Sequence, residues 1–232
     1  MAELETIDLD KEDYERALDN VINYGGESSI TLGRTRNTIF KIFHEDYLEE
    51  HESFRERKEK KIKLLAQATG DLEIPFFPKI YSILTYENDF IGYEMEVHNN
   101  DVSLDIMSDY LSKDELIIVL KEVKEYLEFL HRHPLKIVYG DVFEPNILFD
   151  ESNEVIRLCD IDNVSVMGLG FESMRDVQAN YLDRHKGKIT PELDVYMHNV
   201  LTRDLIFGSN SLDPMVKKYI KYKPKGYLID EL

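Results

Sequence analysis

The spacing of apolar residues predicts several helices along the chain. The clearest covers residues 112–131, where apolar side chains recur every three or four positions behind Ser112 and Glu115, a pair with the spacing of a capping box. Residues 8–22 follow a similar pattern, and residues 45–68 carry many charges and a narrow apolar stripe. The broad apolar face of the 112–131 helix predicts a central position in the second half of the chain.

Alternating apolar and polar residues predict short strands between these helices. In residues 37–43 the alternation places Phe40 and Lys41 on opposite faces, and residues 79–86 and 90–97 are expected to form a hairpin. The sequence therefore predicts an α+β fold. Other expected elements are helices over 103–111, 190–205 and 214–222, with Asp10, Thr190 and Pro191 at helix starts.

Residues 138–163 carry the densest set of chemically useful side chains. A short apolar strand leads into a loop with Asp141 and Asn146, and a second strand, a turn through residues 151–153 and a third strand lead to Asp160. Oxygen ligands on short loops suit Mg²⁺, which one or two carboxylates hold while substrate phosphates complete its shell. This pattern favours a phosphoryl-transfer site. The alternative is a β-hairpin whose Asp and Asn residues only form turns.

This stretch resembles the catalytic and metal-binding loops of the protein-kinase-like superfamily, in which an Asp, four residues, an Asn and a later Asp occur in that order. The resemblance implies that Asp141 is the catalytic base for an accepting hydroxyl, that Asn146 holds a metal, and that Asp160 bridges metal and phosphates. It also implies ATP and Mg²⁺, or Mn²⁺, as the cofactors. The implied fold has two lobes, a small antiparallel sheet with one long helix over residues 1–97 and a mainly helical, shortened lobe over 98–232.

In the first lobe the resemblance implies a nucleotide site. Lys41 would hold the phosphates, and Glu59 on the following helix would pair with it, with Glu56 as the rival for that role. Without the resemblance, Lys41 is equally well explained as a buried aliphatic stem whose ammonium reaches solvent. The resemblance implies further nucleotide contacts at a turn and at a hinge strand, for which an ordinary hairpin turn and a surface hairpin are the alternatives. The turn contributes Gly25, Gly26, Ser28 and Ser29, and the hinge contributes Met95, Glu96, Val97 and His98. Leu148 is also implied as a nucleotide contact.

The chain departs from the family's usual motifs. Tyr139 and Gly140 precede Asp141 where the family has His and Arg, so a phosphorylated activation loop would have no arginine partner there. Asp160-Ile161-Asp162 stands in place of Asp-Phe-Gly. Asp194 resembles the buried Asp that ties a helix to the catalytic loop, and a first-turn acid that offsets the helix dipole is the alternative. Few residues follow the helix predicted over 190–205, and in this the chain resembles small atypical bacterial or RIO-type kinases with a truncated second lobe.

The resemblance implies a phosphotransferase with an alcohol acceptor, first of all a protein serine/threonine kinase. A Gly-Asp pair before the catalytic loop and an acidic residue after it also resemble aminoglycoside- and choline-type kinases, so a small-molecule acceptor is the first alternative. The second alternative is a catalytically weak pseudokinase that acts as a binding scaffold, favoured by the incomplete glycine motif of the first hairpin.

Composition narrows the choice of partners. With 28 Lys and Arg against 46 Asp and Glu residues, the net charge of −18 argues against direct electrostatic binding of nucleic acid and favours a basic protein partner. No basic-then-apolar signal pattern and no bilayer-spanning apolar run occurs, so no membrane partner and a cytoplasmic location are expected. Cys159 is the only cysteine, which excludes an internal disulfide and fits a reducing compartment.

Overall fold

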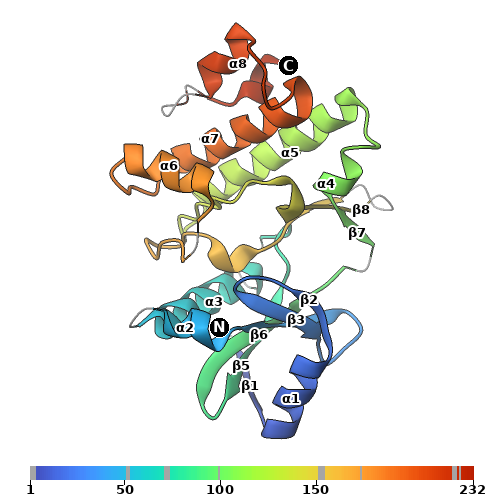
Figure 1. Ribbon diagram of the computed structural model, residues 1–232, viewed down its shortest axis with the longest axis vertical. Helices are drawn as coiled ribbons and strands as arrows, with labels where there is room; N and C mark the ends of the chain where they lie inside the picture. The colour runs from blue at the N-terminus through green and yellow to red at the C-terminus, as the bar shows by residue number, and fades with distance from the viewer. Residues whose placement is uncertain are drawn as a thin grey trace. The chain divides into compact units, whose positions relative to one another are not determined.

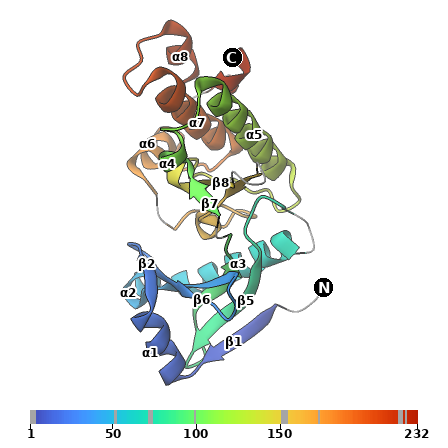
Figure 2. The same ribbon diagram turned by 90° about the vertical axis from the view of Figure 1, so that its right-hand side faces the viewer.

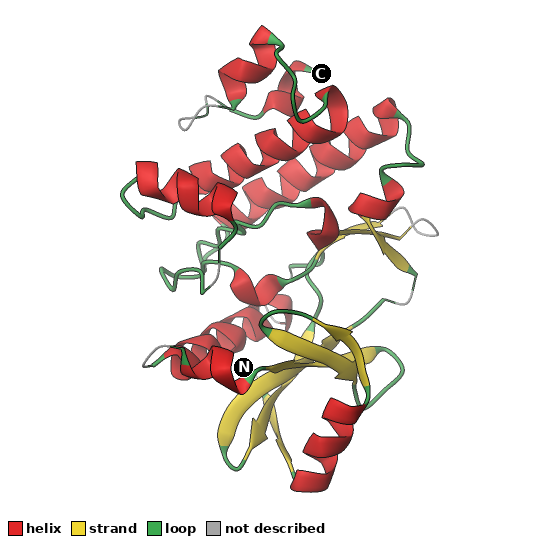
Figure 3. Cartoon of the chain, in the orientation of Figure 1, coloured by secondary structure: helices red, strands yellow, loops and turns green. Residues whose placement is uncertain are grey.

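The chain folds into two units, Met1–Asn99 and Asn100–Leu232, each with its own sheet and helices (Figure 1). The computed structural model describes residues 4–50, 53–70, 74–98, 100–150, 155–172, 174–220, 224 and 226–232. The predicted α+β class is confirmed, since both helices and strands are present in each unit (Figure 3). Within the described ranges, no helix is both long and apolar enough to cross a membrane.

Unit 1 is built on a six-stranded mixed sheet. Its strands lie in the order β1-β5-β6-β4-β3-β2, and all neighbours are antiparallel except β1 and β5, which are parallel. The prediction of a purely antiparallel sheet is therefore wrong at this edge. The strands are β1 (Glu5–Leu9), β2 (Val21–Tyr24), β3 (Ser28–Leu32), β4 (Thr38–Phe43), β5 (Ile80–Tyr86) and β6 (Asp89–Glu96).

The N-terminal segment forms a strand before a helix that is shorter than predicted. Helix α1 covers Lys11–Asp19 instead of 8–22. Asp10 caps it as predicted, since its Oδ1 accepts a hydrogen bond from Asp13 N at 2.8 Å. The preceding strand, β1, was missed because its partner β5 lies far along the chain, where a local pattern does not reveal it.

The helix predicted over residues 45–68 is divided into two. Helix α2 covers Glu45–Glu49 and helix α3 covers Phe54–Gly70. Ser53, directly before α3, has φ of 65°, which no α-helix can accommodate. The predicted apolar stripe of α3 is confirmed, because Phe54, Ile62, Leu65 and Ala66 are all buried.

Helices α1 and α3 pack on opposite faces of the sheet of unit 1 (Figure 1). Ala17 of α1 belongs to a core cluster with Phe40 and Ile42 of β4. On the other face, Lys58 of α3 places its Nζ 4.8 Å from the ring centre of Phe43. Because side chains alternate along β4, Lys41 shares the Phe43 face, the one covered by α3.

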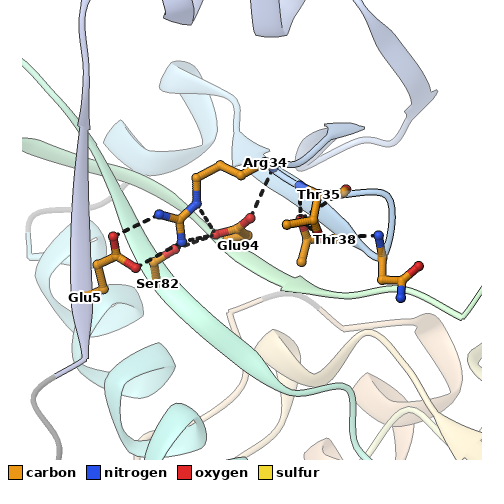
Figure 4. Close-up of polar contacts among 7 residues, drawn as sticks. Glu5, Arg34, Thr35, Thr38, Ser82 and Glu94 are labelled. Carbon is orange, nitrogen blue, oxygen red and sulfur yellow. Dashed lines mark hydrogen bonds and ion pairs between the residues drawn. The ribbon is translucent and has the colours of Figure 1, made fainter.

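An ionic network around the buried carboxylate of Glu94 joins three strands of the sheet (Figure 4). The guanidinium of Arg34 contacts Glu5 of β1 at 2.8 Å and Glu94 of β6 at 2.7 Å. Ser82 of β5 donates a hydrogen bond of 2.9 Å to the same Glu94 carboxylate. Burial alone would raise the pKa of Glu94, but hydrogen bonds from Arg34, Thr38 and Ser82 outweigh burial and lower it. The carboxylate therefore remains ionised inside the sheet.

Unit 2 combines a small sheet with most of the helices of the chain. The strands β7 (Asp101–Ser103), β8 (Ile147–Asp150) and β9 (Val155–Leu158) form an antiparallel sheet in the order β7-β8-β9 (Figure 2). The turn predicted at 151–153 between β8 and β9 lies outside the described residues. The helices are α4 (Leu104–Met107), α5 (Lys113–Arg132), α6 (Asp176–Arg184), α7 (Pro191–Thr202) and α8 (Pro214–Tyr219), and 3₁₀ turns cover Glu144–Asn146, Ile161–Asn163 and Leu228–Glu231.

Helix α5 is the element that the sequence predicts most accurately. Ser112 Oγ accepts a hydrogen bond from Glu115 N, and Glu115 accepts one from Ser112 N at 2.7 Å, which completes the predicted capping box. Its apolar face is buried along its length, and α7 packs against it. In Figures 1 and 2 the two helices lie side by side. Helix α5 is therefore the central helix of unit 2.

The last part of the chain packs onto α7. The helix predicted over 190–205 ends at Thr202 and continues as a π-helical turn to Phe207. The side-chain amide of Asn199 donates to the carbonyl groups of Tyr219 and Gly226, at 3.2 and 3.0 Å, and its oxygen accepts from Leu228 N at 2.7 Å. Helix α8 is described to Tyr219, and residues 221–222 of the helix predicted there lie outside the described residues.

Candidate functional site

The loop that precedes Asp141 is fixed by one buried carboxylate on α7. Asp194 accepts hydrogen bonds from the backbone N–H groups of Tyr139, at 3.0 Å, and Gly140, at 2.6 Å. The imidazole of His131, at the end of α5, donates a third bond of 2.7 Å through Nε2. Asp194 is fully buried. The predicted tie between this Asp and the loop is confirmed, and its role goes beyond that of a first-turn acid.

Gly140 occupies a position that no other residue can take without strain. Its φ is +78°, in the left-handed region, and an added Cβ would lie 2.4 Å from the ring of Phe171. Its carbonyl accepts a hydrogen bond of 2.8 Å from the side chain of Gln178 on α6. The Gly that stands where the family has Arg is thus required by the local backbone and by the packing of Phe171.

Asp141 and Asn146 lie together at the centre of the site, as the sequence predicts. The Nδ2 of Asn146 donates to Asp141 Oδ2 at 2.7 Å and to the Asp141 carbonyl at 3.2 Å. Both side chains are buried. Pro145 and a 3₁₀ turn over Glu144–Asn146 close the loop so that these two side chains meet. Because Nδ2 makes both bonds, Oδ1 of Asn146 is left as a potential metal ligand.

Arg175 is a site residue that the sequence analysis missed. Its Nε donates to Asp141 Oδ1 at 2.7 Å, and its guanidinium lies 4.2 Å from the ring centre of Phe143. Arg175 immediately precedes α6, whose start is stabilised by a 2.5 Å hydrogen bond from Arg175 N to Gln178. No local pattern marks an arginine whose partner is so distant in sequence. The Phe143 ring, which favours a cation above its face, is the one weak signal.

Asp160 is placed at the same end of the β8–β9 hairpin as Asn146. The backbone N–H of Cys159 donates to the Asn146 carbonyl at 3.0 Å, and Asp160 follows directly. The buried hydroxyl of Tyr139 donates to the Cys159 carbonyl, and burial raises the pKa of this phenol well above its usual value. Asp160 itself has φ of 53°, a conformation that Asp tolerates better than most residues. The strand predicted before the loop is reduced to one bridge between Val138 and Ser165.

The chemistry of Asn146 and Asp160 fits a divalent cation of the Mg²⁺ type. Both offer hard oxygen donors, and Mg²⁺ requires few protein ligands because phosphates and water complete its octahedron. Among the described residues, no group of three or more His, Cys, Asp or Glu side chains is arranged to bind a metal. A metal at this site would therefore need additional oxygen ligands from its substrate.

In unit 1, Lys41 lies on β4 as predicted, and its side chain is buried. The carboxylate of Glu59 pairs with Lys63 one turn further along α3, with Nζ and Oε1 2.6 Å apart. Glu56 lies on the exposed side of α3. The glutamate whose pairing with Lys41 the resemblance implies is thus engaged within its own helix in this structure.

The small residues of the first hairpin divide between turn and strand. Gly25 and Gly26 lie in the β2–β3 turn, where Gly25 N donates to the Ser28 carbonyl at 2.9 Å. Ser28 and Ser29 are the first residues of β3 and are buried, and Ser29 Oγ lies 3.2 Å from His44 Nε2. A side chain at Gly26 would meet nothing within 4 Å. Only the two glycines therefore lie in the turn to which the resemblance assigned all four residues.

The expected hinge residues lie at the end of β6. Met95 is half-buried, and the backbone N–H groups of Glu96 and Val97 donate to the carbonyls of Lys79 and Asn37 at 2.8 and 2.9 Å. The His98 ring approaches the Glu96 carboxylate at 3.4 Å. Two of the three backbone donors that the resemblance implies for a base edge are thus used inside unit 1. Leu148, on β8 of unit 2, is half-buried on the face opposite to Phe149.

In a comparison with known proteins, no family model matches the chain, and no curated protein matches it significantly. The assignment of a function therefore depends on the residues of the site and on their geometry.

Proposed function

We propose that this protein is an ATP- and Mg²⁺-dependent phosphotransferase with a two-lobed, protein-kinase-like architecture, and that its acceptor is a hydroxyl group on a protein. The observation that carries the proposal is the Asp141–Asn146 pair. The two side chains are buried on one loop, with Asn146 Nδ2 donating to Asp141 Oδ2 at 2.7 Å. The buried carboxylate of Asp194 accepts hydrogen bonds from the backbone of the same loop. A loop that only formed turns would not need such support.

Asp141 is suited to orient and deprotonate an acceptor hydroxyl. An ionised carboxylate accepts about four hydrogen bonds, and Arg175 and Asn146 provide two of them here. The remaining lone pairs can accept from a substrate O–H, which is the first requirement for a general base. Asn146 and Asp160 would hold Mg²⁺, which when bound neutralises charge on the transferred phosphoryl group.

Arg175 supports the proposal because it supplies positive charge next to the acid. The Arg175 side chain is 46% exposed while the Asp141 side chain is 9% exposed, so the arginine remains partly accessible beside a buried acid. A planar guanidinium in that position can both fix the carboxylate and contact phosphate oxygens. The role of Lys41, buried on β4, in holding the nucleotide phosphates remains part of the same proposal.

Asp141→Asn is expected to lower phosphate transfer by about 100-fold or more, because the amide cannot accept a proton. The measurement is transfer of labelled γ-phosphate from ATP with Mg²⁺ or Mn²⁺ to a basic protein acceptor and to a panel of small alcohols. Asp183→Asn, an exposed acid on α6, is the matched control and should retain full transfer. Transfer by Asp141→Asn at the wild-type rate would refute the assigned role.

The acceptor panel also separates the competing functions. Label on the protein that requires Asp141 supports the proposal, whereas label on a small alcohol assigns a small-molecule kinase. ATP binding without transfer to any acceptor would favour a scaffold. ATP binding is followed by thermal shift, since a ligand that binds only the folded state stabilises it by about 2.7 kcal/mol at 100 times its dissociation constant.

Arg175→Gln is expected to lower the turnover number for phosphate transfer by about tenfold, because Asp141 loses the cation that orients it. The free energy of unfolding should fall by about 1–3 kcal/mol, since the buried Asp141 carboxylate loses one of its two hydrogen-bond partners. Arg175→Lys should recover part of the loss, and Arg184→Gln, at the last residue of α6, should leave the turnover number unchanged. Equal kinetics for all three variants and the wild type would show that Arg175 is structural only.

A further inference from the structure

Helix α3, which packs against β5 and β6 (Figures 1 and 2), places two lysines on its buried face. Lys58 and Lys61 are both 0% exposed, although lysine side chains are almost never fully buried unless they are paired. They lie three residues apart, on the side of α3 that also carries the buried Phe54 and Ile62. An aliphatic stem whose ammonium reaches solvent does not describe them, because the ammonium is buried as well.

The two glutamates of α3 lie outside this buried face. Glu56 is exposed, and Glu59 is half-buried and pairs with Lys63 one turn further along the helix. Lys60, between the two buried lysines in sequence, is exposed to solvent. The helix thus presents cations to the sheet of unit 1, although the resemblance takes a glutamate from this helix.

Lys58 and Lys41 meet at one aromatic ring. The Nζ of Lys58 lies 4.8 Å from the ring centre of Phe43, and the Nζ of Lys41 lies 6.0 Å from the same ring centre. The Nζ of Lys58 also lies 5.7 Å from the ring centre of Tyr47. The faces of aromatic rings attract cations, most strongly where water is excluded. These rings therefore help to hold positive charge in the interior of unit 1.

Strand β3 adds a hydroxyl group to the same face of the sheet. Ser28 is the cross-strand partner of Phe43, so the two side chains share the face that α3 covers. Ser28 is buried, and its hydroxyl can donate one hydrogen bond. It follows the β2–β3 turn, which the resemblance assigns to the nucleotide. Two independent parts of unit 1 therefore direct hydrogen-bond donors to one region.

Three ammonium groups and a hydroxyl suit an anion that carries several charges. A carboxylate offers a single charge, whereas a chain of phosphates offers a charge and several oxygen acceptors on each phosphorus. Lysine binds phosphate as a compact point charge with three rotatable N–H donors. Each of these lysines can therefore donate to a phosphate oxygen and keep a protein acceptor at the same time.

We propose that Lys58 and Lys61 bind the phosphate chain of a nucleoside triphosphate together with Lys41, so that α3 contributes cations where the resemblance implies a glutamate. That the ligand is a nucleotide rests on the proposed function, whereas affinity for a chain of phosphates does not. The two lysines of α3 contact the phosphates and leave the nucleoside to other residues. Their contribution to affinity therefore grows with the number of phosphates.

Isothermal titration calorimetry of the full chain with AMP, ADP, ATP and inorganic tripolyphosphate, at one fixed Mg²⁺ concentration, tests the proposal. Methionine replaces each lysine because it keeps an unbranched apolar stem and removes the charge. We expect Lys58→Met and Lys61→Met each to weaken ATP and tripolyphosphate binding about tenfold, since a hydrogen bond from a charged donor is lost. The loss should be smaller for ADP and smallest for AMP. Lys60→Met, at an exposed lysine of the same helix, should bind all four ligands as the wild type does.

Urea unfolding shows whether the variants remain folded. Replacing a buried charge with an apolar side chain of similar volume is often neutral or stabilising, so both methionine variants should unfold at no lower urea concentration than the wild type. Ser28→Ala is a milder probe of the same region, since it removes only a hydroxyl group. We expect it to weaken ATP and tripolyphosphate binding about threefold.

The other outcomes separate this proposal from the proposed function. Wild-type affinity for ATP and tripolyphosphate in both methionine variants would overturn the proposal, even if phosphate transfer were observed. An equal loss for AMP, ADP and ATP would also overturn it, because that result indicates a structural role for the lysines. So would the absence of tripolyphosphate binding to the wild type up to about 1 mM. Tripolyphosphate binding that depends on Lys58 and Lys61, in a protein that labels no acceptor, would support this site and count against the proposed function.

Discussion

Replacing Asp194 with alanine is expected to lower the free energy of unfolding by about 3–5 kcal/mol. The substitution leaves the buried N–H groups of Tyr139 and Gly140 without their acceptor and removes the partner of His131. Each orphaned buried donor costs about 1–3 kcal/mol, because water cannot replace the lost bond. Urea unfolding followed by circular dichroism gives the value.

Glu192→Ala is the matched control for that substitution. Glu192 lies in the same first turn of α7 but is exposed, so its loss removes a solvent-exposed hydrogen bond with Thr190 and a favourable interaction with the helix dipole, together about 1 kcal/mol. If Asp194→Ala and Glu192→Ala were destabilised equally, the three hydrogen bonds would contribute little, and Asp194 would be a first-turn acid like its neighbour.

Gly140→Ala is expected to destabilise the protein by about 3 kcal/mol or more, through two separable effects. Positive φ costs a non-glycine residue about 1–2 kcal/mol, and the new Cβ would overlap the Phe171 ring, which forces the loop or the ring to move. Since the next residue is Asp141, phosphate transfer should fall together with stability. Both are measured on the same preparation, by urea unfolding and by transfer of labelled γ-phosphate.

Gly168→Ala separates the two effects. Gly168 has nearly the same φ, +82°, but a Cβ there meets nothing within 4 Å. We expect Gly168→Ala to lower the free energy of unfolding only by the backbone cost of positive φ, about 1–2 kcal/mol. Adding Phe171→Ala to Gly140→Ala should relieve the overlap, so that the pair is destabilised by less than the sum of the single changes. Strict additivity of the two single changes would exclude the overlap as the cause.

The parts of the fold that the sequence predicts well are those specified by neighbouring residues. Helix α5 was predicted almost to the residue because Ser112 and Glu115 form a cap within one turn and the apolar face repeats along the helix. The turn between β5 and β6 was predicted for the same reason, and Glu87 and Asn88 both adopt the positive φ of a tight hairpin. Asp141 and Asn146 were placed together because only four residues separate them.

The parts that were missed depend on distant partners. Arg175 has no local pattern that marks it as a site residue, since its role comes from a contact with Asp141 on another segment. The division of α2 from α3 was not predicted, because the charged pattern of residues 45–68 continues across it. For Glu59, spacing alone could not show whether Lys41 or Lys63 would be its partner, and in this structure the shorter, intrahelical pair forms.

The parallel pairing of β1 with β5 sets an order on the folding of unit 1. In this pairing Glu5 lies beside Ser82, and Arg34 links Glu5 on β1 to Glu94 on β6. Strand β1 therefore makes all of these contacts only when β5 and β6 have formed. Closing so long a loop is slow, since its entropy is lost before the contacts repay it. During synthesis on the ribosome, residues 5–9 therefore have no strand partner until β5 (Ile80–Tyr86) has been synthesised.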